Sequence, residues 1–438
     1  MKKHLLALSA AAVLLAPQAV GAEGFSINEW SAEGFAMGGA RMFAENDAAN
    51  MAFNPASLTK VQGEKAKVSV AYIAPHGKWK ADPYDATGSQ LGGPQFVGPQ
   101  SGRNRVNPAF APGMYYAKQL NDKEWLGFGT YARFGNMCQF ERNSIVASSA
   151  FSSRLNGVSL GMNYARKHDN KWSTSIGAEI NYVGLVLDKN LNPMNMAASS
   201  SPLHIDGTSW ALGWNAAANY AFDDKNEFGV VYRSKVKHSM EAEYDIHGTA
   251  GALSSVIPGA SSTGDAYGCV TLPESWSLGY GHKFDDKTRM ELNATWTRWS
   301  RFDALSIALT PGFGAMHPVD GAYVNSALGT KNNWKDGWRY AIGIEHKLSD
   351  KYSIMAGIAH DERGIPDDGA DFMVPTGERD TYSLGVQYHD KKQTIALALG
   401  YMDVGDMNMD GHKQYAYNKA KMYDSYTKIF VLSYQYNF

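Results

Sequence analysis

Hydrophobic and polar residues alternate along most of this chain, and such a pattern of period two predicts β-strands. In 157–164, Val, Leu, Met and Tyr take the even positions, while small or polar residues take the odd ones. The same alternation returns at 228–241 and 290–297, where charged or small residues form the second face. The chain also ends on such a strand, because aromatic or aliphatic residues stand at every second position: Phe430, Leu432, Tyr434, Tyr436 and Phe438. These patterns indicate an all-β protein built of two-faced strands.

The connections between these strands are of two kinds. Short turns that mix acidic and basic residues lie at 121–124, 168–171, 223–226, 285–288, 349–351 and 390–392. Long stretches rich in Gly, Ser, Pro and Asn alternate with them, near 74–107, 136–150, 189–206, 246–270, 307–332, 363–378 and 407–424. Transmembrane barrels combine short periplasmic turns with long outer loops. A soluble β-sandwich is the other interpretation, but the lopsided connections and strands longer than the usual five or six residues disfavour it.

The short turns allow the strands to be counted. Six turns join twelve strands, a further strand enters at 65–74, and the C-terminal strand completes the set. Fourteen strands place both ends of the barrel on the periplasmic side, as a single-chain bacterial barrel requires. Because backbone groups in lipid must all be paired, the last strand is expected to close on the first. The sequence therefore predicts an all-β fold, a fourteen-stranded antiparallel transmembrane β-barrel over 65–438.

Two N-terminal segments lie outside this pattern. In 1–22, basic residues precede a short apolar run and small residues, which predicts a secretory signal too short to span a bilayer. The segment 23–64 shows no alternation and is rich in Phe, Met, Trp and Ile. Fourteen strands enclose a lumen wider than side chains alone can fill. We therefore expect 23–64 to be a hatch inside the barrel, the alternative being a flexible periplasmic extension.

Charge and composition exclude several classes of function. The chain carries 41 basic and 43 acidic residues, a net charge of −2, which is no nucleic-acid footprint. Its two cysteines, Cys138 and Cys269, form no disulfide framework; both are expected in outer loops, where a single cross-loop disulfide is one option. The twelve histidines show no metal-ligand spacing, so we predict no metal and no cofactor, and His238 and His282 are interpreted as structural. No nucleophile–base pairing stands out, and the chain is not predicted to be an enzyme.

Several stretches together resemble one family. They are "EGFSINEWS" (23–31), "NDAANMAFNPASL" (46–58), and the segments 213–238, 272–305 and 332–367. In their order and spacing the chain is similar to the FadL/TodX family of outer-membrane transporters for long-chain fatty acids and other hydrophobic molecules. The resemblance covers essentially the whole chain after the signal. It implies a fourteen-stranded barrel with an N-terminal hatch, in agreement with the count above, and a location in the cell outer membrane.

The resemblance also implies a mechanism of passive transport. A hydrophobic molecule is caught among the outer loops, passes to a pocket above the hatch, and leaves sideways into the bilayer through a gap at a kinked third strand. Lateral exit has a physical reason, since each CH₂ kept out of water is worth roughly 0.8 kcal/mol. The implied partners are a long-chain fatty acid or other hydrophobic small molecule, outer-membrane lipid, and the barrel-assembly machinery, which is expected to read the strand ending at Phe438.

Site residues follow from the same resemblance. The expected kink falls at Arg133, Phe134 and Gly135, where glycine permits a bulge or an interrupted ladder. The hatch motif, interpreted as gating, is expected to comprise Asp47, Asn54, Pro55 and Ala56. Substrate contacts are expected from Phe25, Lys189 and Lys331, the two lysines serving a carboxylate headgroup. Polar contacts between hatch and wall are expected from Asp361 and Arg379.

Four tryptophans, Trp296, Trp299, Trp334 and Trp338, are interpreted as an interfacial aromatic belt.

The sequence leaves other functions open. An aromatic-hydrocarbon channel of the same fold would not need the headgroup lysines. A water-filled porin would need a constricting loop in place of a hatch, and a surface adhesin would use the long loops.

Overall fold

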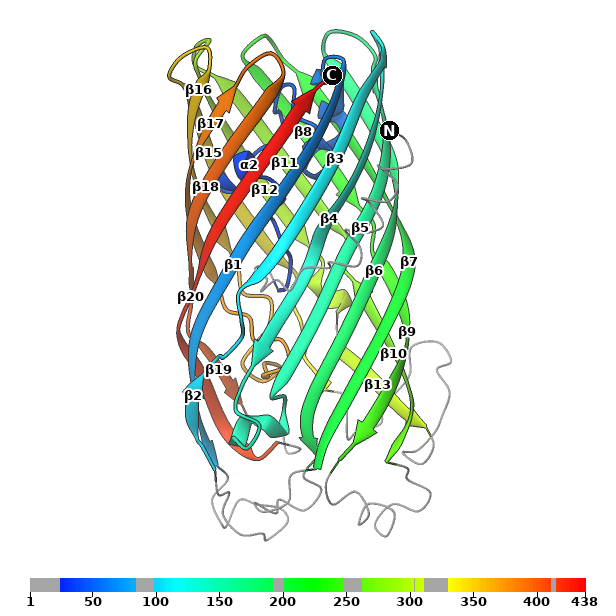
Figure 1. Ribbon diagram of the computed structural model, residues 1–438, viewed down its shortest axis with the longest axis vertical. Coiled ribbons are helices and arrows are strands. Elements are labelled where there is room, and N and C mark those ends of the chain that lie inside the picture. Colours follow the sequence, from blue (N-terminus) through cyan, green and yellow to red (C-terminus); the bar gives the residue numbers. More distant parts are fainter. Residues whose placement is uncertain are drawn as a thin grey trace.

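The computed structural model describes residues 24–83, 98–191, 201–247, 262–302, 304–310, 330–410 and 415–438. Within them, antiparallel strands form one closed barrel (Figure 1). In order around the wall, its strands are β1 (Glu64–Pro83), β3 (Ala109–Asn121), β4 (Glu124–Gln139), β5 (Ser152–Lys167), β6 (Trp172–Leu191), β7 (Ser201–Ala221), β8 (Asn226–Arg233) continued by β9 (Val236–Ile246), β10 (Thr263–Leu272) continued by β11 (Ser275–Lys283), β12 (Thr288–Thr297), β15 (Gly337–Lys347), β16 (Tyr352–Asp361), β17 (Arg379–His389), β18 (Gln393–Val404) and β20 (Tyr417–Asn437).

The last strand closes the barrel. β20 pairs with β18 on one side and, from Lys65↔Asn437 to Pro83↔Tyr417, with β1 on the other. If β8 with β9 and β10 with β11 are each counted as one interrupted strand, the wall of the described residues has fourteen strands. The predicted fourteen-stranded antiparallel barrel, with the C-terminal strand as its seam, is confirmed.

Shorter elements add to the wall or cover its end. They are β2 (Ser101–Arg103), β13 (Ala304–Thr310), β14 (Thr330–Lys331), β19 (Met407–Asp410) and the 3₁₀ turns η2 (Ile145–Ser148) and η4 (Trp299–Arg301). No helix in the described part of the chain is both long and apolar enough to span a membrane.

The outer face of the barrel is apolar because the strands alternate as predicted. On β20, Phe430, Leu432 and Tyr434 are 42, 44 and 40% exposed, while Val431 and Ser433 between them are buried. An aromatic row crosses the outer face of β8, β11, β12 and β15, where Tyr232, Trp276, Trp296 and Trp338 stand directly opposite one another. Trp296 and Trp338 therefore lie in an outward belt, as the sequence predicts.

The six short turns gather at one end, called the turn end here, together with the C-terminus (Figure 1). In four of them an aspartate fixes the chain reversal, because a carboxylate can accept bonds from backbone amides two and three residues later. Asp169 Oδ1, for example, accepts from the amides of Lys171 and Trp172, both at 2.7 Å, and the other turns repeat this with Asp223, Asp285 and Asp390.

At the opposite end, called the loop end, several strands run past their predicted ends. β1 continues to Pro83, β4 to Gln139, and β10 begins at Thr263, all inside stretches predicted as loops. Both cysteines therefore lie in strands, Cys138 in β4 and Cys269 in β10, and both are free thiols. The predicted loop positions and the cross-loop disulfide are wrong, because cross-strand pairing extends the wall where the sequence is rich in turn-forming residues.

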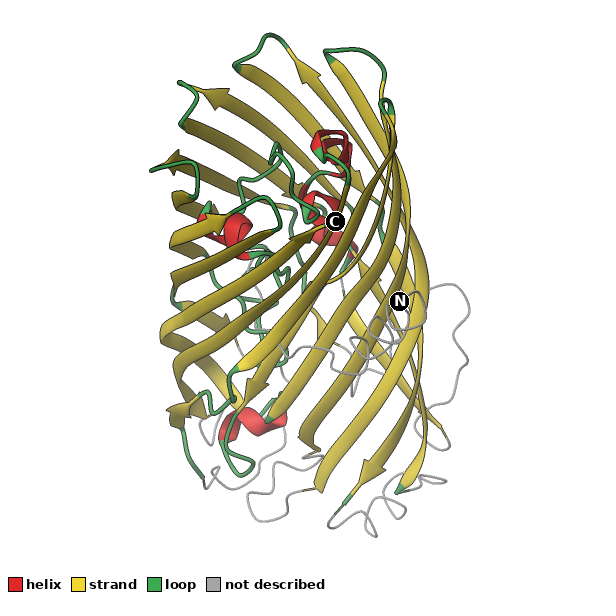
Figure 2. Cartoon of the chain, turned by 45° about the horizontal axis from the view of Figure 1, so that its top comes forward, coloured by secondary structure: helices red, strands yellow, loops and turns green. Residues whose placement is uncertain are grey.

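Residues 24–63 lie inside the barrel, toward the turn end, and β1 begins at Glu64, one residue before the predicted strand (Figure 2). They form α2 (Ala32–Ala36), α3 (Asn50–Phe53) and the 3₁₀ turn η1 (Pro55–Lys60). Local chemistry sets these short elements. Ser31 caps α2 by accepting from the Gly34 amide at 3.1 Å. Asn54 caps η1, whose first residue Pro55 needs no amide partner. This segment is called the hatch below.

Candidate functional site

The side chains that line the lumen change from polar to apolar along the barrel axis. Toward the turn end, the inward positions of β6 are Ser173, Ser175, Glu179 and Asn181, all buried and polar. Toward the loop end, the inward positions of β6 and the strands beside it are apolar and belong to one cluster, which includes Val183, Leu185, Leu187, Leu203, Ile205, Val236, Met240, Val270 and Leu272. The loop-end half of the lumen therefore presents an apolar lining, and the hatch fills the polar half.

Phe25, at the start of the described chain, lies where the hatch meets this lining. Its ring is 4.8 Å from the rings of both Trp299 and Phe302, 5.7 Å from Phe134 and 6.4 Å from Trp334. Trp299 and Trp334 are 0 and 4% exposed. The aromatic-belt prediction is wrong for these two, because the chain leaves β12 after Thr297 and folds Trp299 inward on η4.

The wall is interrupted beside Phe25. Pairing between β3 and β4 ends at Met114↔Thr130, so the rest of β4 has no partner in β3. Pairing between β4 and β5 shifts register between Ala132 and Phe134. The hatch takes up part of the free edge, since Ile27 N donates to Arg133 O at 2.9 Å and Gly135 N donates to Phe25 O at 2.8 Å.

All eight β4 residues from Tyr131 to Cys138 are buried, which shows that this part of the strand bends inward. Arg133 also points into the lumen and donates to Glu179 at 3.1 Å, and Arg233 approaches the same carboxylate at 2.9 Å. The structure thus brings Phe25 together with Arg133, Phe134 and Gly135, although 108 to 110 positions separate them in the sequence.

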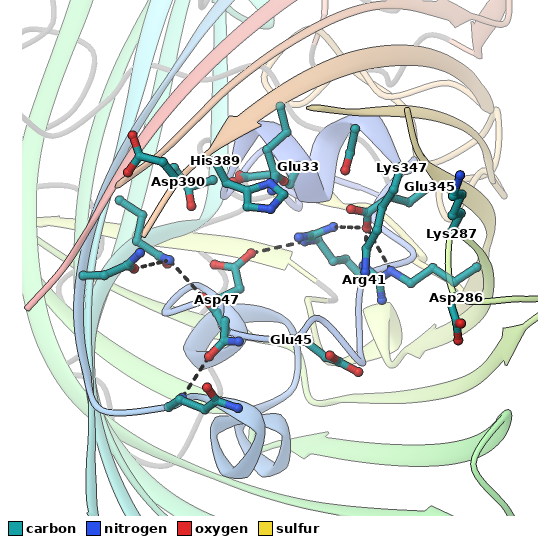
Figure 3. A pocket seen from close by; sticks show the side chains of 18 of the residues that line it. Glu33, Arg41, Glu45, Asp47, Asp286, Lys287, Glu345, Lys347, His389 and Asp390 are labelled. Atoms are coloured by element: carbon teal, nitrogen blue, oxygen red, sulfur yellow. Dashed lines mark hydrogen bonds and ion pairs between the residues drawn. The ribbon is translucent and has the colours of Figure 1, made fainter. Parts of the chain in front are cut away.

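Asp47 belongs to a chain of buried charges at the turn end (Figure 3). Its carboxylate lies 2.8 Å from Lys67 Nζ on β1 and 3.2 Å from Arg41 Nε of the hatch. Lys67 also contacts Glu33 at 2.9 Å, and Arg41 contacts Glu345 on β15 at 3.4 Å. A cavity of about 530 Å³ opens beside these groups toward the turn end. Charged pairs therefore connect this side of the hatch to β1 and β15.

Further along the wall, Glu291 on β12 accepts from the amide of Phe43 at 3.2 Å and from that of Met42. Arg289 links the carboxylates of Glu291 and Glu345. Sequence analysis missed Arg41, Lys67, Arg289, Glu291 and Glu345. Lys67, Glu291 and Glu345 stand at inward positions of alternating strands, so charges on the non-lipid face were the available signal.

The other predicted hatch and wall residues lie as follows. Asn54 Nδ2 donates to Asn219 Oδ1 on β7 at 2.7 Å, and its own Oδ1 accepts from the Ala56 amide. Arg379 Nη2 donates to Gly24 O at 2.9 Å. Asp361 pairs at 2.7 Å with Arg339, whose Nη2 in turn donates to the hatch carbonyl of Gly38 at 2.6 Å, so Arg339 links Asp361 to the hatch.

Lys189 is buried among apolar residues on the inner face of β6. It makes no ion pair among the described residues, and its Nζ lies 5.6 Å from the centre of the Tyr415 ring. The exposed apolar residues on the outer face of β7 end at Trp210, which is paired with Tyr182. On β6, Lys189 is seven positions beyond Tyr182, about 23 Å along the strand toward the loop end, and hence outside the membrane. There burial lowers the pKa of its ammonium to about 8, while Asp371 acts in the opposite direction.

The second predicted headgroup cation, Lys331, is described only through its backbone, which pairs with Ala304 in β13; its side chain lies outside the described residues. Elsewhere in the described chain, no three His, Cys, Asp or Glu side chains gather as metal ligands. At the loop end, the described residues offer an apolar lining, the buried ammonium of Lys189 and, beside Phe25, an interrupted wall.

Comparisons with known proteins agree with this arrangement. The family model described as "Outer membrane protein transport protein (OMPP1/FadL/TodX)" matches residues 12–438. The long-chain fatty acid transport protein of Escherichia coli K12 is 24% identical over 430 residues, which cover 90% of this chain and 91% of the relative. A crystal structure of a Pseudomonas aeruginosa FadL homologue superposes with a TM-score of 0.84 at 20% identity, covering 95% of this chain and all of that chain. The Pseudomonas putida toluene transporter TodX gives a TM-score of 0.67 at 15% identity, covering 94% of this chain and 99% of that one.

Proposed function

Because the chain belongs to the OMPP1/FadL/TodX family of outer-membrane transport proteins, we propose that it carries long-chain fatty acids or closely related amphiphiles into the outer membrane. The family makes it an outer-membrane transporter of hydrophobic compounds and not an enzyme. The finer steps proposed are headgroup capture at Lys189, passage along the apolar lining to Phe25, and lateral exit between β3 and β4.

The interrupted ladder carries this proposal. Since β4 beyond Thr130 has no partner in β3, separating the strands there breaks none of the ladder bonds that elsewhere hold the wall. Phe134 stands on this free edge and contacts Phe25 at the end of the apolar lining. A molecule displacing Phe25 would therefore meet a part of the wall where β4 is paired with the hatch, through Phe25, Ser26 and Ile27, and not with β3.

The lining and the charge fit an amphiphile with a long tail. An alkyl chain that stays against apolar residues avoids a cost of roughly 0.8 kcal/mol for each CH₂ exposed to water. Lys189 can pair with a carboxylate without first breaking an ion pair, because it has none among the described residues. Lys331 is proposed as a second cation for the same headgroup.

The hatch is proposed to act as a gate by local rearrangement rather than by leaving the barrel. Its two sides are held differently. Around α3 and η1, Met51, Leu58 and Val61 pack against Tyr115 and Trp125 of the wall. On the opposite side the charged pairs of Arg41 and Asp47 border the cavity at the turn end. The polar side is the one expected to move, since water in the cavity can replace its contacts.

Uptake of labelled oleate and labelled toluene by cells with and without the protein tests the proposal. We expect protein-dependent oleate uptake that falls at least about tenfold in a Lys189→Ala, Lys331→Ala double variant, because the headgroup loses its cations. The matched control is Lys237→Ala, an exposed lysine on the outer face of β9. Toluene uptake alone would assign the protein to hydrocarbon transport. Oleate uptake unchanged in the double variant would remove the headgroup role.

A further inference from the structure

The loop between β16 and β17, residues 362–378, folds back into the lumen at the loop end and is called the lid here. The Phe372 side chain is fully buried, with its ring 5.1 Å from that of Phe140, 6.2 Å from Trp79 and 5.7 Å from Tyr417. Most loops run over the protein surface, whereas this loop is packed inside the barrel. It therefore covers the apolar lining at the loop end.

The lid lies directly on the bent part of β4. Asn136 Nδ2 donates to Met373 O at 2.8 Å. Cys138 Sγ lies 3.4 Å from Phe372 O and 3.6 Å from Met373 O. Because Cys138 is 2% exposed and the lid covers part of it, we expect its thiol to react faster with a reagent when the lid moves.

One carboxylate fastens the lid. Asp371 is 1% exposed, and its Oδ1 accepts from the amide of Met373 at 2.9 Å. Its Oδ2 accepts from Asn332 Nδ2 at 3.3 Å and from the Tyr415 hydroxyl at 3.2 Å. Asn332 and Tyr415 come from two other segments of the loop end, so Asp371 joins three separate parts of the chain.

Lys189 approaches the same Tyr415 ring, 5.6 Å from its centre. The negative charge of Asp371 acts on the ammonium of Lys189. Both groups are buried, where charges interact more strongly than in water. A second carboxylate bound at Lys189 would therefore lie in the repulsive field of Asp371, as two carboxylates at one site do.

We propose that Asp371 makes the lid selective for anionic amphiphiles: a ligand carboxylate that pairs with Lys189 repels Asp371, breaks its bonds to Asn332 and Tyr415, and releases the lid from β4. The inference rests on the proposed function for the identity of the ligand. A neutral ligand of the same length leaves Asp371 in place, so the lid discriminates by charge rather than by tail length. Asp371 is then a specificity-determining residue that does not itself need to touch the tail.

The first test measures the lid without transport. The purified protein in lipid nanodiscs, carrying Cys269→Ser so that Cys138 is its only thiol, is treated with N-ethylmaleimide. We expect dodecanoate to speed alkylation of Cys138 by at least about fivefold, the lower end of typical coupling between two sites. Dodecanol, which has the same tail and no charge, is expected to have no effect.

Three variants assign the cause. Asp371→Asn is expected to alkylate fast without ligand, and Tyr415→Phe likewise, since each weakens the bond between lid and loop end. Lys189→Met is expected to lose the response to dodecanoate. Asp368→Asn is the matched control, because it removes the same charge from an exposed position of the same loop. Folding of each variant is checked by the mobility shift of the unheated barrel in gels.

The second test compares uptake of dodecanoate and dodecanol by cells. Asp371→Asn is expected to lower the ratio of acid to alcohol uptake at least about fivefold, whereas Asp368→Asn keeps the wild-type ratio. Equal alkylation rates with both ligands, or a wild-type rate in Asp371→Asn, would overturn the inference whatever the uptake results. The predicted alkylation pattern without protein-dependent uptake would instead support the lid and reject the transport proposal.

Discussion

Removing the ammonium of Lys67 is expected to free the hatch without unfolding the barrel. The side chain of Lys67 is 1% exposed, and its Nζ contacts Asp47 at 2.8 Å and Glu33 at 2.9 Å. Both carboxylates belong to the hatch, whereas Lys67 belongs to β1, whose ladder bonds to β3 and β20 do not involve side chains. Lys67→Met keeps most of the volume and removes the charge.

The size of the effect follows from what each carboxylate retains. Asp47 keeps Arg41 at 3.2 Å, but Lys67 is the only ion-pair partner of Glu33 among the described contacts. Burial by itself raises the pKa of a carboxyl, yet Lys67 and Arg41 hold the pKa of Asp47 well below its usual range, so it stays charged at neutral pH. Removing one partner of a buried pair costs about 3–5 kcal/mol. We take about 3 kcal/mol because Arg41 remains, which shifts the hatch equilibrium roughly a hundredfold toward release.

Two measurements report this shift. Hydrogen exchange of the amides in 31–53 is expected to speed up roughly a hundredfold in Lys67→Met, and ion conductance in planar bilayers is expected to rise. Lys65→Met is the matched control. Lys65 lies two positions away on the same inner face of β1, is 7% exposed, and has a hydrogen bond to Asn437 but no ion pair among the described residues.

A further variant separates charge from packing. Adding Glu33→Gln and Asp47→Asn to Lys67→Met removes the two carboxylates that lost their ammonium partner. Replacing all members of a buried ionic group together costs little folding free energy. Slow exchange is therefore expected to return. The reasoning is refuted if Lys67→Met exchanges like Lys65→Met, or if the triple variant exchanges as fast as Lys67→Met alone.

The remaining predictions concern the exit, the headgroup and assembly. Gly135→Val is expected to reduce oleate uptake about tenfold while the barrel stays folded, because a branched side chain crowds the edge where Gly135 meets Phe25; normal uptake would reject the exit between β3 and β4. Dodecanoate binding is expected to weaken as pH rises through about 8, since Lys189 binds a carboxylate only when protonated; affinity that stays constant in titrations from pH 6 to 9.5 would exclude Lys189. Phe438→Ser is expected to lower the amount of assembled barrel in cells but not refolding in detergent, because Phe438 is 58% exposed on the outer face; equal amounts in cells would show that assembly does not depend on the terminal ring.

The sequence alone determined the wall of this protein. Alternation with period two and six short acidic turns predict fourteen antiparallel strands and the closing role of the last one, because both depend on local chemistry repeated along the chain. The terminal strand illustrates this, since Leu432 and Tyr434 face outward and Val431 and Ser433 face inward as their order requires.

Only the tertiary structure decided which side chains meet inside the wall. Trp299 and Trp338 look alike in sequence, but one contacts Phe25 and the other joins the outer belt, because the chain turns inward after β12. Sequence patterns likewise did not pair Asp371 with Tyr415, or Lys67 with Asp47, since such contacts join segments far apart in the chain. Local periodicity fixes which face a side chain takes, whereas partners across the lumen depend on how the closed barrel brings hatch, lid and wall together.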